Sequence, residues 1–372
     1  MKLGIVGLPN VGKSTLFNAI MQGGAEAANY PFCTIDPNVG IVPVPDPRLA
    51  VLEEIYQSKS TIPAVVEMVD IAGLVKGASK GEGMGNQFLS HIREVDAIVH
   101  MVRCFEDDQI VHVHESVDPL RDIEIINLEL ALADLELVEK RLAKAGKGGK
   151  NNDKLYAREP EALQILQSAL AVGTCTRHIK WENPDDHIYA DSLNLLTGKP
   201  VLYALNVLEH EINENNLDKT DKKTNPFVTT AKAFAEEEGS KAFVICAKIE
   251  EEIAALPPEE KSMFLEELGL KQGGLDRIIS AGYELLGLIS FLTAGPKEVR
   301  AWTIRQGLKA PQAAGKIHSD MERGFIRAEV VAFDDLERLG TYNKVKESGL
   351  VRVEGKDYIV KDGDVILVRF NV

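Results

Sequence analysis

The stretch "KLGIVGLPNVGKST", residues 2–15, decides the fold of the first part of this chain. Its opening residues are an apolar run typical of a buried strand, and "GLPNVGKST", residues 7–15, fits the pattern G-x-x-x-x-G-K-[ST]. A helix is expected from Ser14 onward. A strand, a glycine-containing turn and a helix in this order predict a phosphate-binding loop in an α/β domain.

Each residue type in this loop suits the binding of phosphate groups. Glycine lets the backbone curl so that several N–H groups point at the phosphates, and the start of the next helix adds to the attraction. We expect Lys13 to reach the β- and γ-phosphate oxygens and the Ser14 hydroxyl to bind Mg²⁺. Asn10 also suits an ordinary turn. The predicted nucleotide-binding residues here are Asn10, Val11, Gly12, Lys13, Ser14 and Thr15.

Further apolar runs alternate with helical patterns up to about residue 280. The runs are continuous rather than alternating with polar residues, which predicts a parallel sheet covered on both faces. They read "KLGIV", "AVVEMV", "AIVHMV", "VLYAL" and "AFVIC". We therefore predict an α/β nucleotide-binding domain over residues 1–280.

The pattern of apolar residues changes between residues 121 and 198, where the spacing of leucine and isoleucine predicts two helices. The first has a heptad seam, and the second has leucines on one face. The seam is Ile125, Leu128, Leu132, Leu135 and Leu142 with Glu139 as its polar position, and the second face is Leu163, Leu166 and Leu170. The glycine-rich turn "AKAGKGGKNNDK" between them predicts an inserted antiparallel helical hairpin with a lysine-rich tip.

Composition separates the end of the chain from the rest. Residues 296–372 carry 14 Lys and Arg against 12 Asp and Glu, a net charge of +2. The whole chain has a formal net charge of −15, so the preceding 295 residues carry −17. Contacts with a polyanion are therefore expected in the C-terminal part or at the lysine-rich tip. Short β-rich runs such as "RAEVVAF" and "DVILVRF" predict a small separate domain over residues 281–372.

The four cysteines are Cys33, Cys104, Cys175 and Cys246, and their spacing suits neither a CxxC pair nor a zinc site. Scattered thiols in a chain of 372 residues favour a reducing compartment. The chain starts directly with the phosphate-loop strand, and no apolar run approaches the length of a membrane span. We expect a cytoplasmic protein with no membrane partner and no sequence-specific DNA partner.

Two further segments predict the nucleotide-dependent parts of the site. Asp70 ends an apolar run in "VDIAGL", so we expect its carboxylate to hold Mg²⁺ through water and the Gly73 N–H to meet the γ-phosphate. Thr34 in "NYPFCTIDPN" is expected to bind Mg²⁺ when a γ-phosphate is present. The glycine-rich stretch that follows Asp70 is costly to order without a ligand.

Four motifs in this order, "GLPNVGKST", "YPFCTIDPN", "DIAGLVKGASKGEGMGNQFL" and "NVLE", resemble the YchF/Obg-like ATPase subfamily of the Obg-related P-loop NTPases. The resemblance covers essentially the whole chain. It implies a P-loop domain with an inserted helical hairpin and a C-terminal TGS domain with a ubiquitin-like (β-grasp) fold. It also implies an ATPase that associates with ribosomes in translation or stress responses.

The segment "NVLE", residues 206–209, stands where guanine-nucleotide proteins carry Asn-Lys-x-Asp. Aspartate there accepts two hydrogen bonds from guanine, whereas adenine leaves the carboxylate unpaired at a cost of about 1–3 kcal/mol. Glu209 displaces the carboxylate by a methylene, and Val207 lacks the lysine that would cover the base. We expect the Asn206 amide to accept a hydrogen bond from adenine, so ATP is favoured over GTP.

A second base-binding loop is predicted at "VICAKIE", residues 244–250. It resembles the Ser-Ala-Lys loop of the same nucleotide-binding proteins, with Cys246 in place of serine. Ala247 and Lys248 complete the predicted nucleotide-binding residues, although a solvated lysine is a nearly equal alternative for Lys248.

The hydrolytic group is harder to identify from the sequence. Leu74 stands where Ras-like GTPases carry a glutamine that orients water, so another group must act. His112 in "QIVHVH" is the candidate that the resemblance suggests, and Gly73 is the backbone candidate. If this segment is a strand, His114 shares the face of His112. Slow intrinsic turnover is expected.

These features favour a Mg²⁺-dependent ATPase whose partners are ATP and the ribosome, including ribosomal RNA and proteins. Lysines at the hairpin tip, namely Lys144, Lys147, Lys150 and Lys154, would contact RNA phosphates in a salt-sensitive way. A solvated turn is the simpler reading of the same residues. Two alternatives stay open: an Obg-like GTPase in ribosome assembly, and a ribosome- or RNA-binding adaptor with a structural nucleotide.

Overall fold

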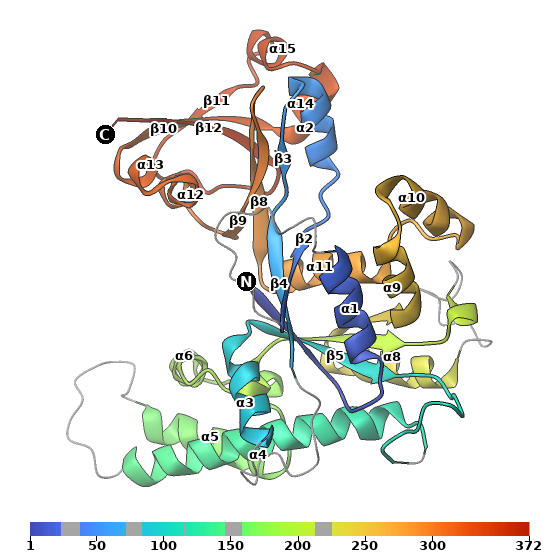
Figure 1. Cartoon of the computed structure of the whole chain (residues 1–372). Coiled ribbons are helices and arrows are strands. Elements are labelled where there is room, and N and C mark those ends of the chain that lie inside the picture. The colour runs from blue at the N-terminus through green and yellow to red at the C-terminus, as the bar shows by residue number, and fades with distance from the viewer. Residues whose placement is uncertain (24–37, 72–83, 115, 146–157, 213–224, 372) are drawn as a thin grey trace. The chain divides into compact units, whose positions relative to one another are not determined.

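The computed structural model describes residues 1–23, 38–71, 84–114, 116–145, 158–212 and 225–371 (Figure 1). The chain divides into two compact units. The first comprises Met1–Ile41 and Glu67–Ile278, and the second comprises Val42–Val66 and Ile279–Val372. Residues 42–66, which the sequence prediction kept within the α/β domain, therefore belong with the C-terminal residues.

The first unit is built on a sheet whose central strands are parallel. Its strands are β1 (Lys2–Val6), β2 (Val39–Pro43), β4 (Val65–Asp70), β5 (Ala97–Arg103), β6 (Val201–Asn206) and β7 (Lys241–Ile245), in the order β2-β4-β1-β5-β6-β7. Strand β1 pairs in parallel with β4 and β5, and β6 pairs in parallel with β5 and β7. All residues of β5 and β6 are buried, which confirms the predicted α/β fold class.

Three helices of this unit lie between successive strands of the sheet along the chain: α1 (Lys13–Gly23), α3 (Met84–Glu94) and α8 (Pro226–Glu238). Helices α9 (Ala247–Ala255) and α10 (Pro258–Glu267) follow the last strand, β7, and α11 (Gly274–Leu285) begins in this unit. In a parallel sheet the carboxyl ends of the strands lie at one edge, where ligands bind. The loops after β1, β4, β6 and β7 are therefore brought to the same edge.

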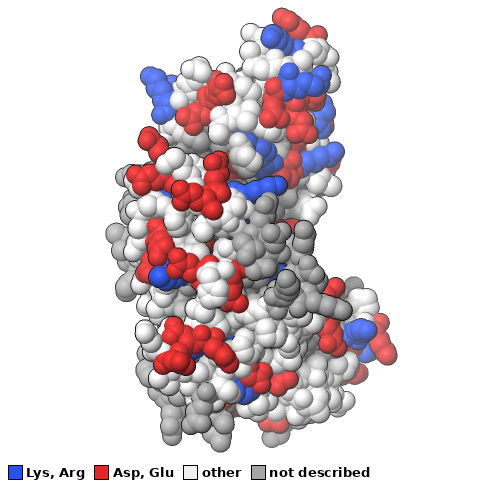
Figure 2. All heavy atoms as spheres, turned by 90° about the vertical axis from the view of Figure 1, so that its right-hand side faces the viewer, with Lys and Arg blue, Asp and Glu red and all other residues white. Residues whose placement is uncertain are grey.

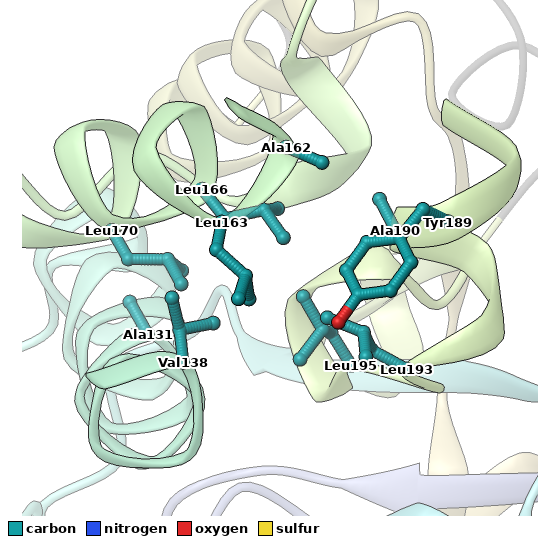
Figure 3. Packing of buried hydrophobic residues seen from close by; sticks show 10 residues of the cluster. All are labelled: Ala131, Val138, Ala162, Leu163, Leu166, Leu170, Tyr189, Ala190, Leu193 and Leu195. Atoms are coloured by element: carbon teal, nitrogen blue, oxygen red, sulfur yellow. The ribbon is translucent and has the colours of Figure 1, made fainter. Parts of the chain in front are cut away.

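Residues 119–198 add a helical layer that packs around its own apolar core. It consists of α4 (Pro119–Ala145), α5 (Glu159–Ala171), the 3₁₀ helix η4 (Thr176–His178), α6 (Pro184–Ser192) and η5 (Leu196–Gly198). Helices α4 and α5 lie side by side (Figure 1). Leu163, Leu166 and Leu170 of α5 point into the shared core, as predicted, where they meet Ala131 and Val138 of α4 (Figure 3).

The predicted seam of α4 is wrong in its central part. Leu128 and Leu132 are 50 % and 40 % exposed, whereas the buried face carries Ala131, Asp134 and Val138. Both carboxylate oxygens of Asp134 accept hydrogen bonds from η5: Oδ1 from the Leu196 N–H, and Oδ2 from the N–H and hydroxyl of Thr197. A buried polar residue thus occupies a position that a purely apolar pattern assigns to the surface.

The second unit combines the C-terminal residues with segment 42–66. Its elements are α2 (Arg48–Tyr56), β3 (Thr61–Ile62), β8 (Leu288–Ala294), β9 (Val299–Arg305), α12 (Ala310–Ile317), α13 (Ser319–Arg323), β10 (Phe325–Ala332), α14 (Phe333–Leu339), α15 (Tyr342–Glu347), β11 (Arg352–Glu354) and β12 (Asp364–Phe370). The sheet order is β11-β10-β12-β8-β9-β3. Phe291, Ala313 and Val330 are among the residues of its core.

Two contacts hold segment 42–66 within the second unit. Strand β3 pairs in parallel with β9, joining Thr61 to Val299. The Arg48 guanidinium lies between Asp46 and Asp362, with nitrogen–oxygen distances of 2.7 Å to each. The hydrogen bond to Asp46 is the main reason that the pKa of Arg48 is raised above its ordinary value.

Three cysteines in the described part of the chain, Cys104, Cys175 and Cys246, are free and buried. Burial raises the pKa of each of these thiols, so they behave as small apolar side chains. Among the described helices, none combines the length and apolar character needed to cross a bilayer.

Candidate nucleotide-binding site

The loop between β1 and α1 has the backbone geometry of a phosphate cradle. Asn10 and Gly12 both adopt positive φ angles, +62° and +96°, so the chain turns sharply before α1 begins. The Leu16 N–H donates to the Gly12 carbonyl at 3.0 Å, which starts the helical hydrogen-bond pattern. The first N–H groups of α1 have no partner within the helix, so they can bind an anion.

Lys13 is held at the end of β4. Its side chain is only 10 % exposed. The ammonium donates to the Ile71 carbonyl at 2.6 Å and lies 3.0 Å from Oδ1 of Asp70. Within the described residues that oxygen accepts no hydrogen bond of good geometry, so the contact with Lys13 is one of charge. The cation is therefore oriented by groups that a phosphate can replace.

The described oxygen ligands fit a hard divalent cation. Asp70 ends β4 next to β1, and Ser14 is an exposed residue at the start of α1. A carboxylate oxygen without a hydrogen bond and a serine hydroxyl are the donors that Mg²⁺ takes beside phosphate oxygens. The other predicted ligand, Thr34, and the backbone candidate Gly73 lie outside the described residues, as does Leu74.

Asn206 joins the phosphate loop to both base-binding loops. Its Nδ2 donates to the Val11 carbonyl at 2.9 Å, and its Oδ1 accepts from the Ala247 N–H at 2.9 Å. The residue is 4 % exposed. Because Oδ1 already accepts from one buried backbone N–H, the predicted hydrogen bond from the adenine amino group would use the second lone pair of this oxygen. Asn206 also positions the loops.

A cavity of about 820 Å³ lies at this edge of the sheet. That size lies within the usual range for ligand pockets. All the predicted nucleotide-binding residues except Val11 line it: Asn10, Gly12, Lys13, Ser14, Thr15, Asn206, Val207, Glu209, Cys246, Ala247 and Lys248. Val11 is buried beside it and contributes its carbonyl to Asn206.

The two base-binding loops have fixed backbones and a charged rim. Val207 is 3 % exposed, and its N–H donates to the Ile245 carbonyl at 2.9 Å. Cys246 immediately precedes α9, and its side chain is buried rather than hydrogen-bonded to the helix start. At the rim, Lys248 Nζ donates to Oε2 of Glu209 at 3.0 Å, and this hydrogen bond raises the pKa of Lys248.

One wall of the cavity was not predicted from the sequence, and the loop after β5 supplies it through Phe105, Asp107 and Ile110. The other unpredicted lining residues are Leu8 and Pro9 in the phosphate loop and Leu208 and His210 after β6. Arg103, which is 1 % exposed, fixes this loop by donating to the carbonyls of Phe105 at 3.0 Å and Ile110 at 2.9 Å. An arginine at the end of a buried strand was the available signal.

His112 does not line the cavity in this structure. It is 6 % exposed, its Nε2 lies 2.9 Å from Oδ2 of Asp122, and its Nδ1 accepts from the His114 N–H at 3.1 Å. The segment is a loop and not a strand, so the condition under which His114 would share the face of His112 is not met. Its neighbour Val111 accepts a hydrogen bond from Asn10 Nδ2 at 3.0 Å, which links this loop to the phosphate loop.

Only part of the basic surfaces predicted from the sequence lies within the residues that the structure describes. Of the tip lysines, Lys144 lies in α4, and Lys147, Lys150 and Lys154 lie outside the described residues. On the face in Figure 2, acidic side chains form several clusters, and basic ones gather mainly over the C-terminal unit. Some basic residues of the C-terminal unit are paired with carboxylates, for example Lys309 with Asp357 at 2.7 Å.

The fold and the site together define a P-loop nucleotide-binding protein with the α/β fold of GTPases. A family model described as "50S ribosome-binding GTPase" matches residues 2–134, and a model of the C-terminal part of YchF GTPases, described as a protein of unknown function, matches residues 288–371. The chain belongs to the YchF family, since curated members are about half identical to it over almost its whole length.

Three relatives illustrate this membership. The chain is 56 % identical to "Ribosome-binding ATPase YchF" of Bacillus subtilis, covering 99 % of both chains. It is 45 % identical to "Obg-like ATPase 1" of rice, covering 100 % of this chain and 92 % of that protein. The solved structure of the YchF GTPase of Schizosaccharomyces pombe is 39 % identical with a TM-score of 0.86, covering 99 % of this chain and 97 % of that one.

Proposed function

We propose that the chain is a Mg²⁺-dependent switch protein that binds and hydrolyses ATP and associates with ribosomes. The observation that carries this proposal is that Lys13 and the base loop line one and the same cavity. In that loop, Val207 and Glu209 stand where guanine-nucleotide proteins carry Lys and Asp. Curated relatives named "Ribosome-binding ATPase" support both the nucleotide and the partner. A protein with this partner is expected in the cytoplasm.

In the proposed complex the phosphates displace Lys13 from its backbone partner. The Lys13 ammonium then pairs with the β- and γ-phosphates, and the N–H groups at the start of α1 bind their oxygens. Ser14, Thr34 and, through water, Asp70 would hold Mg²⁺, which neutralises charge on the phosphates when bound. The Gly73 N–H is proposed to bind the γ-phosphate.

The base loop favours adenine. Val207 and Leu208 give the cavity an apolar wall, and the Glu209 carboxylate is paired with Lys248 rather than directed to a base. A guanine would need that carboxylate for its two N–H donors. Adenine has no such donors to satisfy, so an adenine nucleotide loses less binding free energy than a guanine nucleotide when the carboxylate is paired with Lys248.

Slow turnover is part of the proposal. Leu74 cannot orient a water molecule by hydrogen bonding, and His112 is engaged by Asp122. His112 would act only after the loop that carries it has moved. Loss of a water-positioning group typically costs orders of magnitude in hydrolysis rate.

The ribosome contact is assigned to the helical layer and the C-terminal unit. We infer that residues 121–198 form a helical hairpin whose lysine-bearing tip meets RNA phosphates. We assign residues 281–372 to a TGS domain of β-grasp fold, on a unit that carries the basic end of the chain. Contacts of this kind are salt-sensitive and independent of sequence.

The test compares the wild type with Lys13→Ala in ATP hydrolysis and in cosedimentation with ribosomes, with and without ATP. Lys271→Ala is the matched control, since Lys271 is an exposed lysine outside the cavity. A switch predicts that Lys13→Ala loses hydrolysis and the effect of ATP on ribosome binding, whereas Lys271→Ala keeps both. Unchanged hydrolysis in Lys13→Ala would show that this cavity is not the site.

Two other functions can be tested with the same proteins when GTP hydrolysis is measured beside ATP hydrolysis. An Obg-like GTPase in ribosome assembly is favoured by one observation, that the S. pombe structure is named a GTPase. It predicts GTP hydrolysis faster than ATP hydrolysis. An adaptor with a structural nucleotide predicts ribosome binding that neither ATP nor the Lys13→Ala substitution changes.

A further inference from the structure

The ion pair at the rim of the cavity joins the two base-binding loops. Glu209 begins the 3₁₀ helix η6 (Glu209–Glu211) after β6, and Lys248 lies in the first turn of α9 after β7. Lys248 Nζ lies 3.0 Å from Oε2 of Glu209 and 3.9 Å from Oε1 of Glu252, one turn further along α9. Glu209 and Lys248 both line the cavity.

The backbones on both sides of this pair are fixed, so only the side chains are free to move. The Ala247 N–H is bound by Asn206, and the Leu208 N–H donates to Oε2 of Glu211 at 3.0 Å. The side chains of Glu209 and Lys248 are 54 % and 66 % exposed, so neither is packed in place. The hydrogen bond between them is therefore the main restraint on the direction of the Glu209 carboxylate.

From this geometry we propose that Lys248 is a positioning residue for base selection, which holds the Glu209 carboxylate away from the base. The proposal rests on the proposed function, in that the cavity must bind a nucleotide. Without Lys248, the longer glutamate side chain is free to turn inward and accept hydrogen bonds from guanine N1–H and the 2-amino group. The same carboxylate would face the N1 lone pair of adenine, which disfavours ATP.

This role differs from that of a lysine that only covers the base. A covering lysine contributes equally to both nucleotides, so its loss weakens ATP and GTP together. A lysine that restrains Glu209 changes the ratio of the two dissociation constants. Because the pair is exposed, its contribution is modest and screened by salt, which predicts a change of about two- to fivefold.

The test measures dissociation constants of non-hydrolysable ATP and GTP analogues with Mg²⁺ for the wild type and Lys248→Ala. We expect the ratio of the GTP constant to the ATP constant to fall about two- to fivefold in Lys248→Ala. Lys248→Arg keeps the pair and should keep the ratio. Glu252→Gln removes the more distant carboxylate and should also leave the ratio unchanged.

Two further measurements separate positioning from packing. Glu209→Gln introduced into Lys248→Ala should abolish the gain in GTP binding, because the released carboxylate is absent. The wild-type ratio should also decline with added salt, whereas that of Lys248→Ala should stay constant. Equal weakening of both nucleotides, or an unchanged ratio, would overturn the inference while leaving the ATPase proposal intact. A wild type that binds neither nucleotide would overturn both.

Discussion

Asn206 Nδ2 donates a hydrogen bond to the Val11 carbonyl across 2.9 Å, joining residues 195 positions apart. The other end of the same amide accepts from Ala247, so one buried side chain fixes the phosphate loop and both base-binding loops. The preorganisation of the cavity therefore depends on a side chain that need not touch the ligand.

Asn206→Ala should destabilise the protein by about 2–3 kcal/mol, because a buried carbonyl and a buried N–H lose their partner. Nucleotide affinity should fall as well. Chemical denaturation and titration measure the two effects. Asn18→Ala is the control, since Asn18 is exposed and its hydrogen bond to Glu251 spans 3.3 Å, and it should change stability by less than about 0.5 kcal/mol. Equal effects of both substitutions would contradict the anchoring role.

Gly12→Ala should weaken nucleotide binding by about tenfold or more, equivalent to ~1.4 kcal/mol. A Cβ at Gly12 would lie 2.3 Å from Asn206 Nδ2, in a backbone with φ of +96°. Gly239→Ala is the matched control, because Gly239 has φ of +73° but no atom within 4 Å of its added Cβ. The control should lose about 1 kcal/mol of stability and no affinity. Normal binding by Gly12→Ala would refute this steric argument.

Asp134→Ala should lower the free energy of unfolding by about 2–4 kcal/mol, since the N–H groups of Leu196 and Thr197 lose their buried acceptor. Glu136→Ala, two positions away on α4, removes an exposed carboxylate paired with Lys140 and should cost less than about 1 kcal/mol. Urea denaturation of both variants distinguishes them. Comparable small losses would mean that Asp134 does not hold η5.

Stability should depend on pH through His100 of β5. Burial, aided by Arg177, lowers the pKa of His100 to about 3. Below the ordinary pKa of about 6.5 the unfolded chain binds a proton that the folded chain does not. The free energy of unfolding therefore falls as the pH falls, by up to about 1.4 kcal/mol per unit from this group.

His100→Phe tests this contribution, because it removes the titrating ring and keeps an aromatic side chain beside Tyr203. Denaturation curves between neutral and acidic pH should show a shallower loss of stability in the variant than in the wild type. Parallel pH profiles for the two proteins would show that His100 does not contribute.

The phosphate loop and its surroundings were predictable because local chemistry determines them. "GLPNVGKST" requires a tight turn and a helix start, and parallel strands necessarily bring their carboxyl ends to one edge. The residues of the base loops therefore met Lys13 in one cavity, as their order along the sheet predicts. The role of Asn206 was not predictable, since its partners are fixed only by the packed structure.

Other features have a weak local signal or none. The face of α4 was misassigned because a buried carboxylate with partners from η5 replaces a leucine in the packing. The placement of residues 42–66 depends on a strand of two residues, Thr61–Ile62, which is too short to give a periodic pattern. The wall around Phe105 depends on Arg103, whose partners are backbone carbonyls.

The most direct test of the account is calorimetric titration of ATP and GTP analogues into nucleotide-free protein with Mg²⁺, beside a variant with Val207→Lys and Glu209→Asp. We expect the wild type to bind ATP more tightly than GTP and the double substitution to shift the preference toward GTP. Tighter binding of GTP by the wild type, or no shift in the variant, would contradict the assignment of residues 206–209 as the loop that selects adenine.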